Sequence, residues 1–289
     1  MSNTIELAKS FVPKLDECYR LASLTSVLDG APELAKQGAN ANELIIPMMS
    51  MDGLADYSRN GGYVQGGVTM TNETVKCNFD RGRRFDVDVM DDLETAGLAF
   101  GRLSAQFIRD KVVPELDAFR FASYCGISGV TKKEETLADG AATVAALSAA
   151  VTAMDDEEVT ATGRYLFITP TLLQGINDMD TTKSKKALEG FERVIKVPQR
   201  RFYTAIKQLS GKTGEEAGGY TKATGAANIN FAIVQKDALI QYTKHAAPKI
   251  IAPENNPDAD AYVFGYRMVG IAKAYKNMLS GMYFSHDKA

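Results

Sequence analysis

The stretch "TVKCNFDRGRRFDVDV", residues 74–89, alternates between two kinds of position without a change of register. The odd-numbered positions are apolar at both ends, but Arg81 and Arg83 interrupt them in the middle, and the even-numbered positions are polar or glycine. A period of two is typical of a β-strand with one buried face. As one strand the stretch would span roughly 53 Å, close to the ~50 Å diameter of a compact chain of this length.

Two arrangements satisfy this pattern. Typical strands have about five or six residues, which favours two strands with a turn at Gly82. The alternative is one long ribbon. Either arrangement needs a partner strand, and we predict it at residues 61–70, followed by a turn at residues 71–73, "TNE".

A second long element follows directly. Apolar side chains in residues 91–123 recur at spacings of three and four, which predicts one face of a helix. Pro114 is expected to kink or break this helix, because proline lacks the amide hydrogen and clashes with the preceding turn. If nearly continuous, the helix runs roughly 50 Å. A long ribbon that leads into a long helix is not typical of a compact sphere.

The rest of the chain predicts an α/β unit followed by further strands. The glycine-rich, polar residues 209–228 are expected to form an exposed, mobile loop. The predicted elements are a helix at 140–154, a strand at 164–169, a helix that begins at Pro170, strands at 192–198 and 229–236, and β-structure at 249–253, 261–275 and 280–286.

Composition gives no sign of a reactive site. The chain has two histidines, His245 and His286, and neither has the spacing of a metal or catalytic motif. Three separated cysteines argue against a disulfide framework and fit a reducing compartment. A net charge of −3 supplies no general attraction to nucleic acid or membrane. We therefore predict no enzyme, and no catalytic, cofactor-binding or metal-binding residues.

The order of these elements resembles that of the major capsid proteins of tailed bacteriophages with the Hong Kong 97-type fold. An N-terminal arm, a long hairpin, a long helix, an α/β insertion and a C-terminal β-ribbon follow one another. The resemblance rests on the whole set of segments, none of which is catalytic, and together they cover most of the chain. They are residues 62–95, 108–123, 164–170 and 229–267.

The resemblance implies an α+β architecture with named parts. Residues 1–43 would form the N-terminal arm, and 44–90 an extended loop, a β-hairpin that lies over a neighbouring subunit. Residues 91–137 and 246–289 would form the peripheral domain with its spine helix. Residues 138–245 would form the axial domain around the fivefold and sixfold centres.

The resemblance also implies a function. The chain would assemble as pentamers and hexamers into the icosahedral head that encloses phage double-stranded DNA, without sequence-specific binding and without a membrane. Assembly would take place in the bacterial host cytoplasm, with a portal and, because the extended loop begins by residue 44, a separate scaffold protein. Two alternatives stay open: an encapsulin-like nanocompartment shell and a soluble α/β enzyme.

Five residues are candidates for contacts between subunits. If the ribbon leaves its own subunit, then Arg81, Arg83 and Arg84 are placed to meet acidic side chains of an adjacent copy. A solvated, charged strand tip is the alternative, because exposed ion pairs contribute little. The resemblance adds Lys76 and Asn277, since some relatives crosslink a lysine of the extended loop to an asparagine of the peripheral domain. Both are otherwise ordinary solvated residues.

Overall fold

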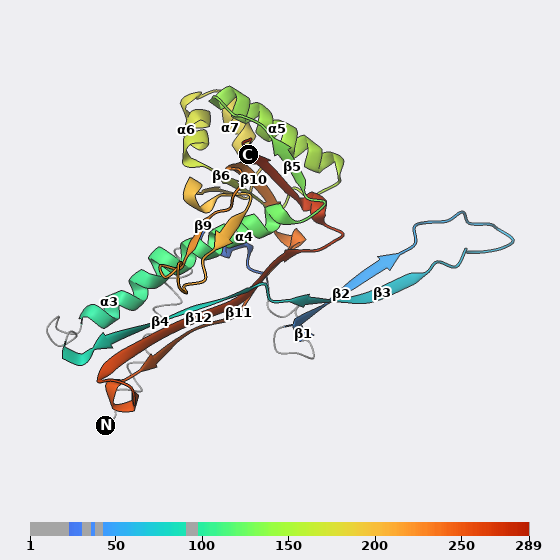
Figure 1. The fold of residues 1–289 in the computed structure, drawn as a ribbon. Helices are drawn as coiled ribbons and strands as arrows, with labels where there is room; N and C mark the ends of the chain where they lie inside the picture. Colours follow the sequence, from blue (N-terminus) through green and yellow to red (C-terminus); the bar gives the residue numbers. More distant parts are fainter. Residues whose placement is uncertain (1–22, 31–35, 38–42, 91–97, 289) are drawn as a thin grey trace.

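The computed structural model describes residues 23–30, 36–37, 43–90 and 98–288 (Figure 1). A compact lobe of helices and strands lies at the top of the view. Long strands and helix α3 extend below it, and a two-stranded hairpin projects away from both. The mixture of helices and strands confirms the predicted α+β class.

The upper lobe, which we call the α/β lobe, comprises residues 131–235 and 282–286. Five of its described strands form a sheet in the order β5-β13-β10-β6-β7. The central strand β10 pairs antiparallel with β13 and β6, and its side chains are buried along its whole length. The strands are β5 (Thr131–Glu134), β6 (Arg164–Ile168), β7 (Arg193–Lys196), β10 (Ile229–Gln235) and β13 (Met282–His286).

Helices pack against both faces of this sheet. Helices α5 (Gly140–Asp156), α6 (Pro170–Asp178) and α7 (Thr182–Glu189) bury their apolar sides against one face. On the other face, the Phe121 ring of helix α4 lies 5.1 Å from the ring of Phe167 in β6. The core of the lobe is therefore two apolar layers separated by the sheet.

Most predictions for this lobe are confirmed. The helix at 140–154, the strands at 164–169, 192–198 and 229–236, and the helix that begins at Pro170 are all present. The predicted last strand, 280–286, is also present, as β13, although the resemblance would place it, like residues 131–137, in the peripheral domain. Strand β13 instead lies between β5 and β10 in the α/β lobe. Its consecutive apolar side chains are buried because both faces of the sheet are covered.

The lower body, which we call the long-strand ribbon, is an antiparallel sheet in the order β11-β12-β4. Its strands are β4 (Phe79–Asp88), β11 (Leu239–Ile251) and β12 (Ala261–Ala274). The predicted turn at Gly82 is wrong, because β4 runs through this residue and pairs with β12 along its length. A Cβ atom at Gly82 would lie 2.8 Å from the carbonyl oxygen of Tyr266. Glycine is needed here for the close approach of two strands.

The hairpin, residues 43–76, consists of β2 (Glu43–Met51) and β3 (Val68–Lys76), and β1 (Lys36–Gln37) pairs with its base. The predicted partner strand at 61–70 is wrong, and the predicted turn at 71–73 lies inside β3. Residues 61–67 contain four glycines, offer no regular apolar face and form the tip instead. The alternating stretch 74–89 therefore belongs to two sheets.

The junction between these sheets lies at Cys77 and Asn78. The Asn78 side chain accepts a hydrogen bond from the Ala272 N–H and donates one to the Ala272 carbonyl, both at 3.0 Å. The side chain of Asn78 thus forms the two hydrogen bonds to Ala272 that a paired backbone residue would form, at the point where the hairpin leaves the long-strand ribbon.

The long helix is nearly continuous. Helix α3 (Leu98–Phe107) leads through a π-helical turn (Ile108–Val112) into α4 (Val113–Gly126). Pro114 neither breaks nor ends the helix, because it lies in the first turn of α4, after the wider π-turn. At 1.5 Å per residue the described helix is roughly 43 Å long. Its predicted first two turns, residues 91–97, lie outside the described residues.

Short 3-10 turns link several of these elements. They are η1 (Ser26–Leu28), η4 (Gln199–Arg201), η5 (Lys236–Ala238), η6 (Pro253–Asn255) and η7 (Leu279–Gly281).

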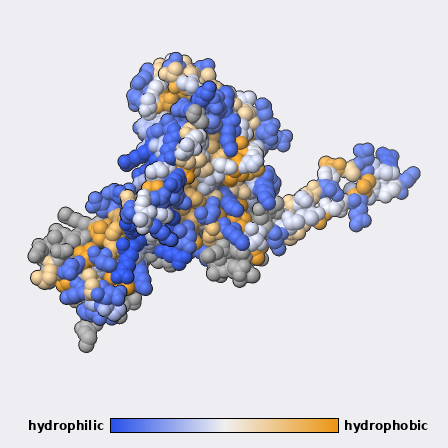
Figure 2. Space-filling view, viewed as in Figure 1, coloured by the Kyte–Doolittle hydropathy of each residue, from blue (hydrophilic) through white to orange (hydrophobic). Residues whose placement is uncertain are grey.

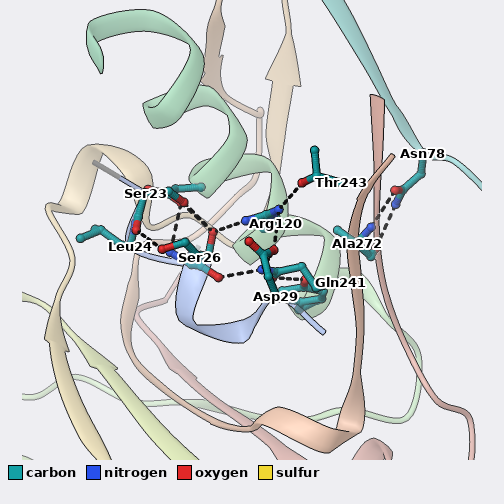
Figure 3. A network of polar contacts seen from close by, with 12 residues as sticks. Ser23, Leu24, Ser26, Asp29, Asn78, Arg120, Gln241, Thr243 and Ala272 are labelled. Carbon is teal, nitrogen blue, oxygen red and sulfur yellow. Dashed lines mark hydrogen bonds and ion pairs between the residues drawn. The ribbon is translucent and has the colours of Figure 1, made fainter. Parts of the chain in front are cut away.

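Residues 23–30, the best described part of the predicted N-terminal arm, lie in the core beside α4 (Figure 3). Arg120 donates to Thr25 Oγ1 at 2.8 Å and to Asp29 at 3.1 Å. Gln241 of β11 donates to Asp29 at 2.7 Å and accepts from the Tyr124 hydroxyl at 2.6 Å. This buried polar network ties the segment to the long helix and to the long-strand ribbon. Residues 1–22 lie outside the described residues.

Candidate assembly surfaces

Exposed large apolar side chains are concentrated on the hairpin. Among the described residues, eight of the ten exposed large apolar side chains lie between residues 49 and 70. Figure 2 shows hydrophobic surface on this projection, away from the rest of the molecule. They are Met49, Met51, Leu54, Tyr57, Tyr63, Val64, Val68 and Met70. An exposed apolar patch of this kind marks a surface that binds another molecule.

The tip of the hairpin has a defined shape although it has no core of its own. Ser58 and Gly62 exchange backbone hydrogen bonds at 2.8 and 3.2 Å. The rings of Tyr57 and Tyr63 lie 4.9 Å apart, and Asp52 accepts the Gly67 N–H at 2.7 Å. These contacts shape the tip, and both tyrosine side chains stay exposed to solvent.

The arginines of the alternating stretch lie on β4, in the long-strand ribbon, and not on the hairpin. The Arg81 guanidinium donates from Nε to Glu115 of α4 at 2.8 Å and from Nη2 to the Leu209 carbonyl at 2.7 Å. Arg83 donates to the Glu216 carbonyl at 2.9 Å. The placement of these residues on an arm that leaves its subunit is wrong.

Arg84 lies on the opposite face of the same strand. It forms an exposed ion pair with Asp86 at 2.8 Å, and the hydrogen bond from this carboxylate raises the pKa of the guanidinium. All three arginines thus have partners within their own chain. Contacts with a second copy through any of them stay a prediction.

The two residues of the predicted crosslink are both on the surface. Lys76 is the last residue of β3, opposite Glu43 of β2, and its side chain is exposed. Asn277 is exposed in the turn after β12, as the sequence predicts. Each is accessible to another copy, and the crosslink itself stays a prediction.

A groove lies between the long-strand ribbon, the long helix and the loop 209–219. Its volume is roughly 1130 Å³, and its walls include Phe85, Phe107 and Tyr220. Sequence reasoning missed this groove and missed Glu115, which pairs with Arg81. The available signal was the position of Glu115 in a helix segment with buried apolar residues, because a buried charge needs a partner.

The described part of the chain lacks a metal cluster, and its buried cysteine has a raised pKa. Within it, no three histidine, cysteine or acidic side chains come together as a metal site. Burial raises the pKa of the Cys125 thiol to about 11, which keeps it protonated and unreactive at neutral pH. No helix in the described ranges combines the length and the apolar character needed to cross a bilayer.

Comparison with known proteins shows similarity in structure only. No family model matches the sequence, and no curated protein is similar to it. A virus-like particle from Pyrococcus furiosus has a TM-score of 0.60 at 10% identity, over 97% of this chain and 99% of that chain. The capsid of cyanophage P-SCSP1u has a TM-score of 0.56 at 12% identity, over 87% and 85%.

The mature capsid of bacteriophage PhiM1 gives a similar result, with a TM-score of 0.57 at 9% identity over 85% of this chain and 82% of that chain. Each of these three matches covers 85% or more of this chain. The chain therefore has the Hong Kong 97-type fold of tailed-bacteriophage capsid proteins.

Proposed function

We propose that this chain is the major capsid protein of a tailed bacteriophage, which assembles as pentamers and hexamers into the icosahedral head. The observation that carries the proposal is the projecting hairpin with its exposed apolar side chains, in a chain with a capsid fold. The hairpin lies over a neighbouring copy in the shell and buries these side chains there.

The energetics favour such a contact. Full burial of one leucine or aromatic side chain stabilises by about 1.5–3 kcal/mol. Leu54 is fully exposed and Tyr63 is 91% exposed, so nearly all of each side chain is available to contact a partner. Because each copy repeats the contact, a modest gain per subunit stabilises a closed shell through multivalency.

The other partners follow from the same role. Other copies of the chain form the shell, a portal closes one vertex and a separate scaffold protein guides assembly in the host cytoplasm. The shell encloses double-stranded DNA without gripping it, so a net charge of −3 is compatible with this role. The chain is a structural protein and not an enzyme, and it acts in the virion without a membrane.

A cellular nanocompartment is the second candidate function. The Pyrococcus furiosus virus-like particle covers 97% of this chain, and that observation favours a shell of the same fold around a different cargo. Electron microscopy with nucleic-acid measurement separates the two. DNA-filled heads with a tail vertex support the phage, and small shells around a protein cargo support the compartment.

The shell proposal is tested with hairpin variants. Leu54→Asp and Tyr63→Asp are expected to abolish particles in sedimentation and electron microscopy, while the melting temperature of the subunit stays unchanged. Asn60→Asp is the matched control, because it adds the same charge to the same exposed tip without removing an apolar side chain. Wild-type yields of shells from both apolar variants would overturn the role of the hairpin, and a wild-type chain that forms no particles would overturn the proposed function itself.

A further inference from the structure

Arg81 joins three separate elements of its own chain. From β4 its Nε binds Glu115 of α4, and its Nη2 binds the carbonyls of Leu209 at 2.7 Å and Gly219 at 3.3 Å. Leu209 and Gly219 also bond to each other through the backbone, at 2.8 Å. One guanidinium therefore holds the base of the loop 209–219, which belongs to the α/β lobe, against the long-strand ribbon.

Arg83 holds the same loop near its far end. Its Nη2 donates to the Glu216 carbonyl at 2.9 Å. A Cβ atom at Gly211 or at Gly218 would lie 3.1 Å from Arg83 Nη1, and both glycines have positive φ angles. The glycine-rich sequence thus lets the loop bend around a guanidinium from another part of the fold.

Packing alone does not hold this loop. The groove of roughly 1130 Å³ lies beneath it, between β4 and the long helix, and is not filled by the described side chains. The Glu115 side chain is only 12% exposed and also accepts from Gln208 of β8 (Ile206–Gln208), which pairs with β9 (Tyr220–Lys222), at 3.3 Å. The connection across the groove is therefore polar, and Arg81 is at its centre.

We propose that Arg81, Glu115 and the loop 209–219 form a clamp that fixes the α/β lobe relative to the long-strand ribbon. The next step rests on the proposed function. In a shell, the angle between the α/β lobe and the long-strand ribbon sets how neighbouring subunits tilt, and the tilt sets the diameter of the particle. Nothing in the clamp needs a second copy, so its closure is a property of the isolated subunit.

The first test uses the unassembled subunit. Arg81→Ala is expected to speed tryptic cleavage after Lys212, and amide exchange in 209–219, by about tenfold or more. A hydrogen bond to a charged group typically exceeds the free energy that corresponds to a factor of ten. Arg84→Ala is the matched control. It removes an arginine from the same strand, and the side chain of Arg84 donates its hydrogen bond to Asp86 of that strand. Equal loop protection in both variants would overturn the clamp.

Two further variants guard against misfolding of Arg81→Ala. Glu115→Gln keeps the shape of the side chain but removes its charge, and Arg81→Lys keeps the charge but not the forked hydrogen bonds. Both are expected to open the loop to a smaller extent than Arg81→Ala. Protection equal to that of the wild type in these folded variants would also refute the clamp.

The second test concerns the shell. Particles of Arg81→Ala are expected to show a broader range of diameters by electron microscopy than those of the wild type and of Arg84→Ala. An open loop in particles of unchanged diameter would overturn the link to curvature. If the wild type forms no shells, the proposed function fails, while the loop measurements on the subunit still decide the clamp.

Discussion

Replacement of Asp117 by alanine is expected to destabilise the folded subunit severely. This carboxylate is fully buried in α4. It accepts from the Ser23 hydroxyl at 2.9 Å, from the Thr25 hydroxyl at 2.7 Å, and from the backbone N–H groups of Leu24 and Thr25 at 3.1 and 3.3 Å. Arg201 of the α/β lobe completes the set as an ion pair at 3.3 Å. Alanine removes the acceptor and leaves all of these donors in place.

The magnitude follows from burial. Removal of one partner of a buried ion pair typically costs about 3–5 kcal/mol, because the remaining charge stays buried without compensation. Arg201 is 13% exposed, so water screens it little. We expect a loss of about 3–5 kcal/mol, which lowers the melting temperature of a chain of this size by on the order of 10 °C. Asp117→Asn keeps the size and one acceptor oxygen, so its loss should be smaller.

The assay is thermal and urea unfolding of the unassembled subunit. Asp86→Ala is the control, because Asp86 is half exposed and pairs with Arg84 on the surface. A loss below about 1 kcal/mol for Asp117→Ala, or equal losses for the two variants, would refute the reasoning. In that case residues 23–25 would contribute little to the stability of the core.

Three further predictions concern other parts of the chain. Gly82→Ala is expected to cost about 1–3 kcal/mol in urea unfolding through collision with the Tyr266 carbonyl, whereas Gly190→Ala, with none of the described atoms within 4 Å of its Cβ, should cost less. The hydrogen bonds from Lys207 and the Ser210 N–H lower the pKa of Glu215 from 4.5 to about 2. Because the folded-state pKa is depressed, this contribution to loop closure is present above pH 4.5 and lost as the pH falls towards 2, and the amide protection factors in 209–219, taken relative to the intrinsic exchange rate at each pH, should fall over that window. If Lys76 and Asn277 crosslink, boiled and reduced particles should give a ladder on a denaturing gel that Lys76→Arg abolishes; a single band near 31.3 kDa would contradict the crosslink.

Elements with their own periodicity could be predicted from the sequence. Helix α5 and strands β6 and β10 follow from local patterns of apolar residues, because the period of a helix or a buried strand is written into a short segment. The same holds for the alternation in residues 74–89, which the structure keeps across Cys77 and Asn78. The exposure of Asn277 in a turn was also predictable.

Pairing between distant segments could not be predicted in the same way. The apolar residues of 43–51 and the residues of 61–70 could each have paired with the alternating stretch that begins at Thr74, and only the glycines of 61–67 argue against the second segment. Strand β13 is apolar at consecutive positions, a pattern that fits any sheet covered on both faces. Local sequence therefore identifies strands more reliably than it identifies their neighbours.

The arginines show the same limit at the candidate site. A basic side chain on an apolar strand face looks the same whether its acidic partner lies in its own chain or in another copy. Arg81 finds Glu115 and the loop 209–219 only because the fold brings β4, α4 and the α/β lobe together. The groove has no sequence signal of its own, because its walls come from segments far apart in the chain.

Cryo-electron microscopy of particles assembled from the full chain tests the central claim most directly. We predict closed shells of pentamers and hexamers in which the hairpin of each copy lies on a neighbouring copy, with Leu54 and Tyr63 buried in that contact. A chain that stays monomeric at all protein and salt concentrations, with and without its scaffold, would contradict the claim. Shells in which the hairpin points into solvent would contradict it equally.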